Sequence, residues 1–389
     1  MTVANQPLVS VVVPVYGTAS FLPACLDSLL AQTLTDIEII TVNDASPDES
    51  QAIIERYVSQ DARVKPLINH ENQQSYETRR RGFAAATGLY IATCDSDDCL
   101  PLTALEALYK TAQKTGADLV HGQMREFVAG KSLISAPHSS SFLASDGRSY
   151  ILSFLRFCRG WSACGKLYHR QVVERALESL PIVRGLHISD DLLTSYFFGL
   201  ATQKYARLAE DVYHYRAPSI SYFAMPERSL TYISDAFTVF AILKDHISQN
   251  SGNEEYAYWL RLLIRRFIIS LFKDLPDSVP VAQASEIISE KLGAEYLANL
   301  YAGTSSSFVS DRSSPANYSA ILLRIFFYFP GRFSSTGRSS IFSALRITAY
   351  EFLLYVKYFV SLNNTRGWGY VFGKILKPFQ SRLNRLIRK

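Results

Sequence analysis

The segment VSVVVPVY at residues 9–16 is a β-branched, apolar run of the kind that forms a strand buried on both faces of a parallel sheet. Short apolar runs and helical patterns alternate after it as far as residue 121. The expected strands are 9–15, 37–42, 64–68, 89–93 and 117–121, and the expected helices are 21–30, 48–59, 77–86 and 102–115. We expect the helix at 48–59 to begin with Ser46 as N-cap and Pro47 in the first position. This alternation predicts βαβ units and an α/β fold with a largely parallel sheet.

Composition excludes several classes of protein. The 389 residues, 48% hydrophobic and 19% charged, are enough for two globular domains. Five cysteines without a C-x-x-C pair argue against a disulfide framework or a zinc site. No G-x-G-x-x-G follows the first strand and no P-loop motif occurs, which disfavours a dinucleotide oxidoreductase and a P-loop kinase. We find neither a signal peptide nor an uninterrupted run of about 20 apolar residues, so we expect a cytoplasmic protein.

Charge and composition divide the chain into three expected parts. Residues 1–225 form the α/β domain, 226–310 are helical with patterns at 232–247, 254–272 and 282–292, and 311–389 form an aromatic-rich basic tail. The formal net charge is +5, yet residues 320–389 alone hold twelve Lys or Arg against one acid, Glu351.

Apolar and basic residues repeat at helical spacing over 372–388, as in an amphipathic helix on an anionic membrane surface. A helical bundle with a basic, solvated face is the alternative interpretation. Nucleic-acid binding is the least favoured of the three, and we expect no nucleic-acid partner.

Polar residues follow the second expected strand. Asn43 and Asp44 stand where a ligand binds in an open α/β sheet, beyond the carboxyl ends of the strands. A carboxylate there can accept a hydrogen bond from a nucleobase or a ribose hydroxyl. The alternative is that Asp44 and Ser46 only form a turn and cap the next helix.

A cluster of carboxylates, CDSDD at residues 94–98, follows the fourth expected strand. Three carboxylates this close repel one another unless a cation or hydrogen-bond donors neutralise them. In an extended conformation Asp95 and Asp97 point to the same side, which would let them share a metal ion. A solvated acidic turn is the alternative.

A second acidic pair, Asp190 and Asp191, opens a helical pattern at 190–200. Acidic residues are common in the first turn of a helix because they complement its dipole. The pair by itself therefore favours a structural role over a catalytic one.

These segments together resemble the family 2 glycosyltransferases of the GT-A fold, of the bacterial cell-surface polysaccharide type. The resemblance covers about residues 8–222, and its pieces occur in the family's order. They are VSVVVPVY (9–16), CLDSLLAQT (25–33), EIITVNDASPDES (38–50), Arg79 with Gly82, GLYIATCDSDD (88–98), SDD (189–191) and YHYR (213–216). The resemblance implies a Rossmann-like mixed sheet flanked by helices.

The resemblance also implies a role for each matching residue. Nucleotide-sugar binding falls to Pro14, Tyr16, Asn43, Asp44, Arg79, Asp95, Ser96 and Asp97; Mn²⁺ or Mg²⁺ binding to Asp97 and Asp98; and general-base catalysis to Asp191 beside Asp190. His214 is a further candidate metal ligand, with a structural histidine as the alternative. Trp161 and Lys166 match a region that borders the acceptor site in relatives, although Trp161 is also typical of a core residue.

Five positions depart from the family's pattern, one of them Asp190, which replaces the usual Glu. Asn43 replaces a frequent Asp, and Gln74, Thr78 and Arg80 replace Gly, Ala and Asn. Of the three consecutive arginines at 79–81, we expect only Arg79 to face the diphosphate, because neighbours on a helix point about 100° apart. The alternative is that all three add positive charge near the diphosphate.

The implied function is a metal-dependent, inverting transfer of a sugar from a nucleotide-sugar, most simply a UDP-sugar, to a hydroxyl of a glycan or lipid-linked glycan. The enzyme would then lie at the inner face of the plasma membrane. The alternative is a catalytically idle member of the family that serves as a binding or assembly module. A processive synthase is disfavoured because its Q-x-x-R-W motif is absent.

Overall fold

The computed structural model describes residues 6–127, 145–157, 160–216, 226–250, 252–274, 279 and 281–301. The chain divides into two compact units, residues 1–293 and 294–389. In the second unit the structure describes only α11 (Ala294–Tyr301). The predicted basic tail at 311–389 lies outside the described residues.

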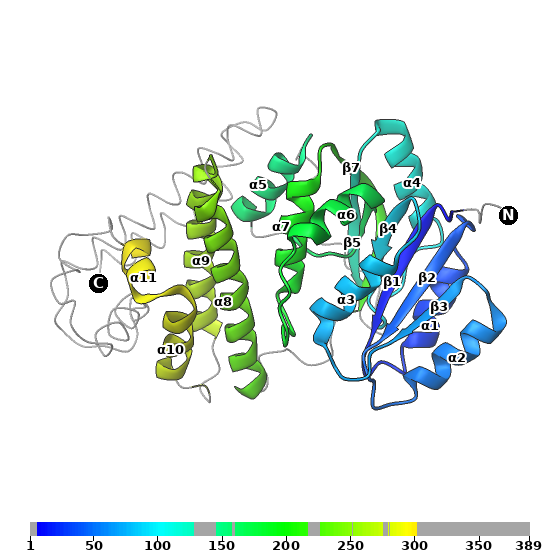
Figure 1. The fold of residues 1–389 in the computed structure, drawn as a ribbon, viewed down its shortest axis with the longest axis horizontal. Helices are drawn as coiled ribbons and strands as arrows, with labels where there is room; N and C mark the ends of the chain where they lie inside the picture. The colour runs from blue at the N-terminus through cyan, green and yellow to red at the C-terminus, as the bar shows by residue number, and fades with distance from the viewer. Residues whose placement is uncertain are drawn as a thin grey trace, which may run out of the picture. The chain divides into compact units, whose positions relative to one another are not determined.

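A seven-stranded mixed sheet forms the centre of the first unit (Figure 1), in the order β3-β2-β1-β4-β6-β5-β7. Its strands are β1 (Val9–Val15), β2 (Ile37–Asn43), β3 (Val64–Ile68), β4 (Tyr90–Thr93), β5 (Leu119–Phe127), β6 (Lys166–His169) and β7 (Tyr205–Arg216). β6 is antiparallel to both β4 and β5, and β7 is parallel to β5. All strands except β6 therefore end at the same edge of the sheet.

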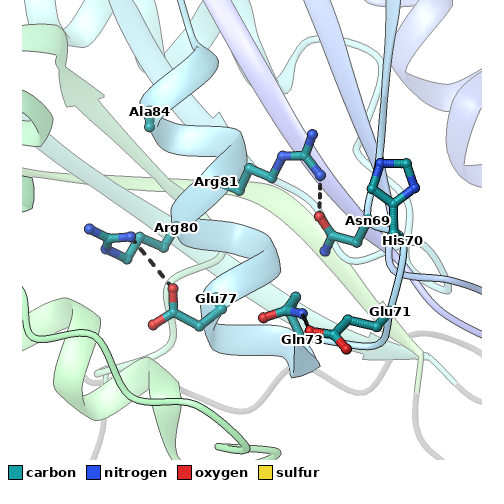
Figure 2. A pocket seen from close by; sticks show the side chains of 8 residues that line it. All are labelled: Asn69, His70, Glu71, Gln73, Glu77, Arg80, Arg81 and Ala84. Carbon is teal, nitrogen blue, oxygen red and sulfur yellow. Dashed lines mark hydrogen bonds and ion pairs between the residues drawn. The ribbon is translucent and has the colours of Figure 1, made fainter.

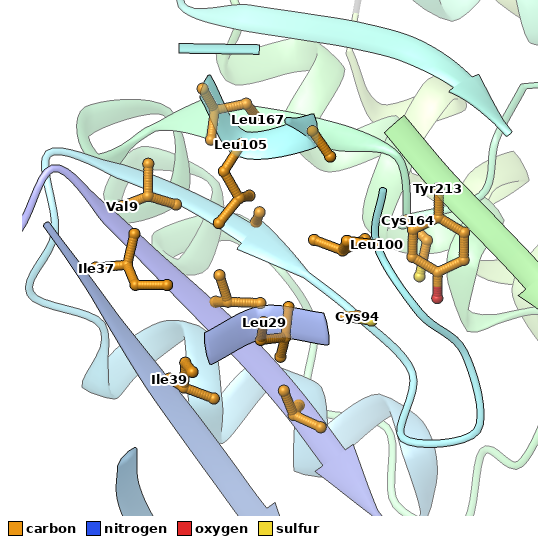
Figure 3. Close-up of a cluster of buried hydrophobic side chains, with 14 of the residues drawn as sticks. Val9, Leu29, Ile37, Ile39, Cys94, Leu100, Leu105, Cys164, Leu167 and Tyr213 are labelled. Atoms are coloured by element: carbon orange, nitrogen blue, oxygen red, sulfur yellow. The ribbon is translucent and has the colours of Figure 1, made fainter. Parts of the chain in front are cut away.

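Helices cover both faces of this sheet. They are α1 (Leu22–Leu30), α2 (Ser50–Gln60), α3 (Gln74–Ala85), α4 (Ala104–Thr115), α5 (Gly147–Phe157), α6 (Arg170–Ser179) and α7 (Asp190–Ala201). The alternation of side chains along β1 explains the two layers. Val9 and Val11 belong to a fully buried cluster with Leu29 of α1 and Leu105 of α4 (Figure 3).

The opposite face of β1 packs against α3. A Cβ atom on Gly82 would lie 2.2 Å from Val12 Cγ1, so only glycine allows α3 to approach this closely. This close approach fixes the position of Arg79, one turn earlier on the same helix.

Three more helices complete the first unit: α8 (Pro226–Gln249), α9 (Glu254–Asp274) and α10 (Val281–Leu292). They confirm the helical region expected after residue 226, and α8 contacts α7, α9 and α10. Within the described part of the chain, no helix is both long enough and apolar enough to cross a bilayer.

The expected strands and helices of the first 121 residues are all present, with two differences in detail. Ser46 is not an N-cap: α2 begins at Ser50, whose N–H donates to Asp48 Oδ1 at 3.1 Å. Ser46 Oγ instead donates to the Val15 carbonyl at 3.2 Å, since the chain turns back toward β1 before the helix starts. The second difference is that β5 runs on to Phe127, because its polar second half pairs with β7.

Candidate active site

The ends of β1, β2 and β4 bring the predicted site segments to one edge of the sheet. Val9–Val12 of β1 pair with β4, and all seven residues of β1 pair with β2, in parallel register. Asp44 N–H donates to the Val15 carbonyl at 2.9 Å, and the hydroxyls of Thr18 and Ser96 lie 2.8 Å apart. Segments more than 75 residues apart in the sequence therefore meet here, beyond the carboxyl ends of parallel strands.

A cavity of about 300 Å³ lies beside the carboxylate cluster. Three of its lining residues are acidic and come from two separate segments, Asp95 and Asp98 after β4 and Asp191 from α7. Met124, Ser162, Cys164, Tyr213 and Tyr215 complete the lining. The sequence pattern of Asp190–Asp191 alone favoured a structural role for this pair. The fold nevertheless brings the pair to the carboxylate cluster.

Arg79 connects the two acidic segments. Its guanidinium is buried, forms an ion pair with Asp190 Oδ2, donates to Asp95 Oδ1 at 2.8 Å and lies 4.0 Å from Asp191 Oδ1. Burial opposes its charge, but Asp190, Asp95 and Asp191 outweigh this and raise the pKa of Arg79 well above its usual value. Arg79 Nε is buried without a hydrogen-bond partner in the described residues.

Asp190 and Asp191 differ in accessibility. The side chain of Asp190 is 10% exposed and faces Arg79, whereas that of Asp191 is 35% exposed and lines the cavity. Burial raises the pKa of Asp190 to about 7 against the opposing effect of Arg79. Burial also raises the pKa of Asp191, while Arg79 and a hydrogen bond from Ala163 N–H lower it. Asp191 is therefore the carboxylate of this pair that a substrate can reach.

Residues 95–98 form a turn, closed by a 3.0 Å hydrogen bond from Asp98 N–H to the Asp95 carbonyl. The strand ends at Thr93, so the extended conformation expected to place Asp95 and Asp97 on the same side is wrong. Asp98 is buried and accepts from Tyr213 Oη and Arg216 N–H, both at 2.6 Å. Burial and the nearby Asp95 raise the pKa of Asp98 to about 8, and the same two causes raise the pKa of Asp97.

Known proteins resemble this chain over most of the described fold. EpsH of Bacillus subtilis is 30% identical over 253 residues, which make up 65% of this chain and 72% of EpsH. Glycosyltransferase GlyG of Streptococcus pneumoniae is 30% identical over 252 residues, 60% of this chain and 78% of GlyG. Residues 10–175 match the model of glycosyl transferase family 2. This chain belongs to glycosyl transferase family 2.

A solved structure confirms the GT-A fold. Staphylococcus aureus TarS 1–349, in complex with UDP-GlcNAc, superposes with a TM-score of 0.56 over 73% of this chain and 80% of TarS 1–349. At 18% identity this likeness concerns the fold alone. Family membership makes the protein a glycosyltransferase.

The residues predicted to bind the nucleotide comprise one exposed ring and two tightly bonded polar side chains. Tyr16 is 51% exposed at the end of β1, directly after Pro14-Val15. Asp44 is buried, and its carboxylate accepts from Asn69 Nδ2 at 2.6 Å and from the N–H groups of Gln73 and Gln74.

Asn43 is bonded locally as well. Its Nδ2 donates to Gln51 Oε1 at 2.7 Å, and its Oδ1 accepts from Ser46 N–H at 3.1 Å. In the ligand-free fold Asn43 and Asp44 thus shape the loops after β2 and β3, and base recognition by either stays a prediction.

The three arginines at 79–81 point in different directions, as their helical spacing predicts. Arg80 and Arg81 line a separate cavity of about 600 Å³ along α3 (Figure 2). There Arg80 pairs with Glu77 at 3.5 Å and Arg81 donates to Asn69 Oδ1. None of the acidic residues of the smaller cavity lines this one.

The backbone of His214 pairs with that of Cys99, directly after Asp98, but its side chain has a different direction from those of its neighbours. Tyr213 and Tyr215 line the small cavity, so the side chain between them faces the other side of β7. The charged groups that influence His214 are Asp211 and Arg125, and burial lowers its pKa. In the described residues the His214 side chain forms no metal-binding group with Asp97 and Asp98.

The two predicted acceptor residues differ from each other. Trp161 is half-buried, whereas Lys166 is 1% exposed and directs its ammonium to backbone carbonyls of residues 160 and 162. Lys166 thus supports the segment that borders the cavity instead of lining the cavity itself.

Tyr213 and Tyr215 are site residues that sequence reasoning missed. Both lie within the YHYR segment at 213–216, in which only His214 was predicted as a site residue, because histidine is a common metal ligand. Period-2 alternation would have placed the two tyrosines on one face and His214 on the other, had β7 been anticipated.

Proposed function

We propose that this glycosyltransferase moves a sugar from a nucleotide-sugar donor, most simply a UDP-sugar, to a hydroxyl of a glycan or lipid-linked glycan acceptor, with inversion at the anomeric carbon. One observation carries the proposal: Asp191 lines the same 300 Å³ cavity as Asp95 and Asp98. An acceptor hydroxyl in this cavity would be within reach of a carboxylate base, next to the cluster assigned to the donor.

Asp191 suits the role of general base. It is the exposed member of its acidic pair, and burial raises its pKa above that of an ordinary aspartate. A base is most effective when its pKa approaches the working pH. The N–H of Ala163 donates to Asp191 Oδ1 at 2.9 Å and orients the carboxylate. Its other oxygen would accept the acceptor's proton as the hydroxyl attacks the sugar.

The donor would lie along the edge of the sheet between Tyr16 and the carboxylate cluster. The exposed ring of Tyr16 offers a stacking surface for a base. Asp95, half-exposed at the cavity and anchored by Arg79, can accept from a ribose or sugar hydroxyl. The same fold binds UDP-GlcNAc in TarS, which supports a UDP-sugar here.

A divalent cation fits the chemistry of the donor set. No group of three or more His, Cys, Asp or Glu side chains is arranged to hold a metal within the described ranges. Mg²⁺ in phosphoryl sites typically uses only one or two carboxylates and takes its other ligands from phosphate and water. Asp97 and Asp98 would supply these carboxylates, and burial together with the nearby Asp95 raises the pKa of both. Bound Mn²⁺ or Mg²⁺ would stabilise the negative charge of the departing diphosphate.

The test is UDP release from UDP-glucose, UDP-galactose and UDP-GlcNAc by the 389-residue chain, with Mn²⁺ and with EDTA. We expect release with at least one donor, dependent on the metal. Asp191→Asn should lower the turnover at least about 100-fold without loss of UDP binding, since removal of a general base costs 10²–10⁴-fold. The matched control is Asp211→Asn, which removes a carboxylate paired with Arg125 outside the cavity.

Two outcomes would contradict the proposal. Wild-type turnover by Asp191→Asn would exclude this residue as the base. Binding of UDP without release from any donor would favour the idle binding module instead. We also propose that residues 320–389 bind the enzyme to an anionic membrane surface. This part of the proposal is a prediction from the sequence.

A further inference from the structure

Three successive backbone carbonyls, those of Gly160, Trp161 and Ser162, all accept hydrogen bonds from two buried side chains. Lys166 Nζ donates to the carbonyl of Gly160 at 3.0 Å and to that of Ser162. Ser195 Oγ donates to the carbonyl of Trp161 at 2.5 Å. We call residues 160–163 the strap, because both of its ends and its middle are tied to the elements beneath it.

The strap continues directly to Asp191. Ala163, the residue after the three carbonyls, donates its N–H to Asp191 Oδ1 at 2.9 Å. Ala163 is fully buried, so water does not compete for this hydrogen bond. On its outer side, Ser162 lines the cavity together with Asp191. The strap is therefore both a wall of the cavity and a partner of the proposed base.

Local backbone geometry lets the strap turn its carbonyls inward. Gly160 is the first residue of the strap, and Gly165 follows two residues after its end. Their φ values are +82° and +70°, in the left-handed region that favours glycine. Gly122 N–H donates to the Gly165 carbonyl at 3.0 Å and fastens this end to β5.

The supporting side chains come from two rigid elements. Lys166 begins β6, Ser195 lies in the middle of α7, and Lys166 Nζ is 3.4 Å from Ser195 Oγ. Both residues are buried, and Lys166 also lies 5.5 Å from the centre of the Tyr150 ring.

A buried ammonium without a directly bonded carboxylate is costly for a fold. Burial lowers the pKa of Lys166 to about 7, opposed by the more distant Asp191. An apolar side chain of similar length would avoid this cost. Its three N–H groups, however, can bind several carbonyls at once, which no apolar side chain can do.

We propose that Lys166 and Ser195 are positioning residues that hold the strap and, through Ala163 N–H, direct the carboxylate of Asp191 at the acceptor hydroxyl. This inference rests on the proposed role of Asp191 as the general base. The sequence predicted that Lys166 binds the acceptor directly. In this proposal Lys166 instead supports the strap, which borders the cavity.

The test compares Lys166→Met and Ser195→Ala with the wild-type chain, using whichever UDP-sugar the wild type turns over. We expect kcat to fall about 10- to 100-fold, because small displacements of a catalytic group have effects of this size. The dissociation constant of UDP should change less than about twofold, since in the described residues the backbone hydrogen bonds of the strap go to Lys166, Ser195 and Asp191. Loss of the Ala163 hydrogen bond and of the lysine charge should raise the pKa of Asp191 and move the acid limb of kcat to higher pH.

A second readout does not need turnover. Hydrogen exchange measured by mass spectrometry should show faster exchange of the amides at 160–165 in both variants. The matched control is Thr202→Val, which removes another buried hydroxyl, bonded to the Phe198 carbonyl at 2.8 Å after the end of the same helix. The control should leave the strap, the acid limb and kcat unchanged.

The outcomes separate the strap from the proposed function. Wild-type exchange at 160–165 together with a wild-type acid limb in Lys166→Met and Ser195→Ala would overturn the inference. If Asp191→Asn keeps its activity, the base assignment fails even where exchange at the strap increases. If the wild type releases UDP from no donor, the proposed function fails, and the exchange data alone decide whether the two side chains hold the strap.

Discussion

At the scale of single residues, Arg79 holds the two acidic segments of the site together. A fully buried guanidinium joins Asp190 of α7 to Asp95 after β4, two segments that otherwise repel each other. Removal of a buried guanidinium alone lowers the stability of the fold, because its carboxylate partners stay buried without a compensating charge. Removal of the guanidinium together with its carboxylate partner lowers the stability far less. Arg79 therefore has a structural role in the ligand-free fold, and phosphate binding by Arg79 stays a prediction.

Arg79→Met should lower the free energy of unfolding by about 3 kcal/mol at pH 8, in line with other buried pairs that lose one partner. Without Arg79 the pKa of Asp190 rises further above its unfolded value. Stability contributed by a group with a raised pKa is present at low pH and is lost as the pH rises through the folded-state pKa. The loss of stability should therefore be smaller at pH 5 than at pH 8, as measured by urea denaturation.

The double variant Arg79→Met, Asp190→Asn is the control for this prediction. It removes both charges and should recover most of the lost stability at pH 8. A double variant as unstable as Arg79→Met would mean that packing of the long side chain, not charge, explains the effect.

For the carboxylate cluster we predict binding of a divalent metal ion in the presence of UDP. With UDP present, Mg²⁺ should raise the melting temperature of the wild type, by about 2 °C for each kcal/mol of binding. Asp97→Asn should remove most of this shift, because one of the few protein ligands loses its charge. Asp211→Asn should keep the shift. An equal shift in Asp97→Asn and wild type would place the metal elsewhere.

At the scale of elements, the helical region holds the segment that precedes α7 through the side chain of Asp235. Asp235 of α8 accepts from the N–H groups of His187 and Ile188, at 2.8 and 3.0 Å, with a single oxygen, Oδ2. These residues directly precede Ser189, which has a φ of +66°, and the acidic pair that begins α7. Strained backbone of this kind persists only where its surroundings hold it in place. Helix α8 thus helps to hold the backbone that leads into α7.

Asp235→Leu should lower turnover at least about tenfold and stability by about 1–3 kcal/mol, because the N–H groups of His187 and Ile188 lose their buried acceptor. Asp235→Asn should stay within a few-fold of the wild type, since the amide oxygen can accept both hydrogen bonds. UDP release and thermal unfolding measure the two effects.

The matched control on the same helix is Asp245→Asn, whose side chain is 59% exposed. It should behave like the wild type. If Asp235→Asn were as damaging as Asp235→Leu, the charge of Asp235 and not its acceptor oxygen would be the essential feature.

At the scale of the whole molecule, charge is divided between an acidic catalytic part and a basic end. The first 319 residues are net acidic, and residues 320–389 carry twelve basic side chains against Glu351. Lys and Arg near an anionic surface contribute about 1 kcal/mol each, so a cluster of this size can bind a membrane without spanning it. This stays a prediction from sequence.

The chain should float with vesicles that contain phosphatidylglycerol and remain unbound with neutral phosphatidylcholine vesicles. Salt at 0.5 M should release it, since the Debye length falls well below 10 Å. A variant with the Lys and Arg residues of 374–389 changed to Gln should lose most of the binding. Flotation of this variant equal to that of the wild type would rule out the tail as the membrane contact.

The pattern of the sequence predicted the α/β fold and the strand-end positions of Asp44 and Asp95, because βαβ units and strand alternation follow from local periodicity. It missed β6, α6 and β7. β6 has four residues and β7 is rich in polar groups, so neither has the apolar run that marks the N-terminal strands.

The sequence by itself therefore determined the family, the fold class and the residue types of the site, since these depend on local patterns and on motif order. Only the tertiary structure decided which side chains meet. It joined Asp191 to the carboxylate cluster through Arg79, turned His214 away and placed Lys166 beneath the strap. The physical reason is that such contacts depend on which face of an element is buried and on pairings between residues about 100 positions apart, and no local pattern contains this information.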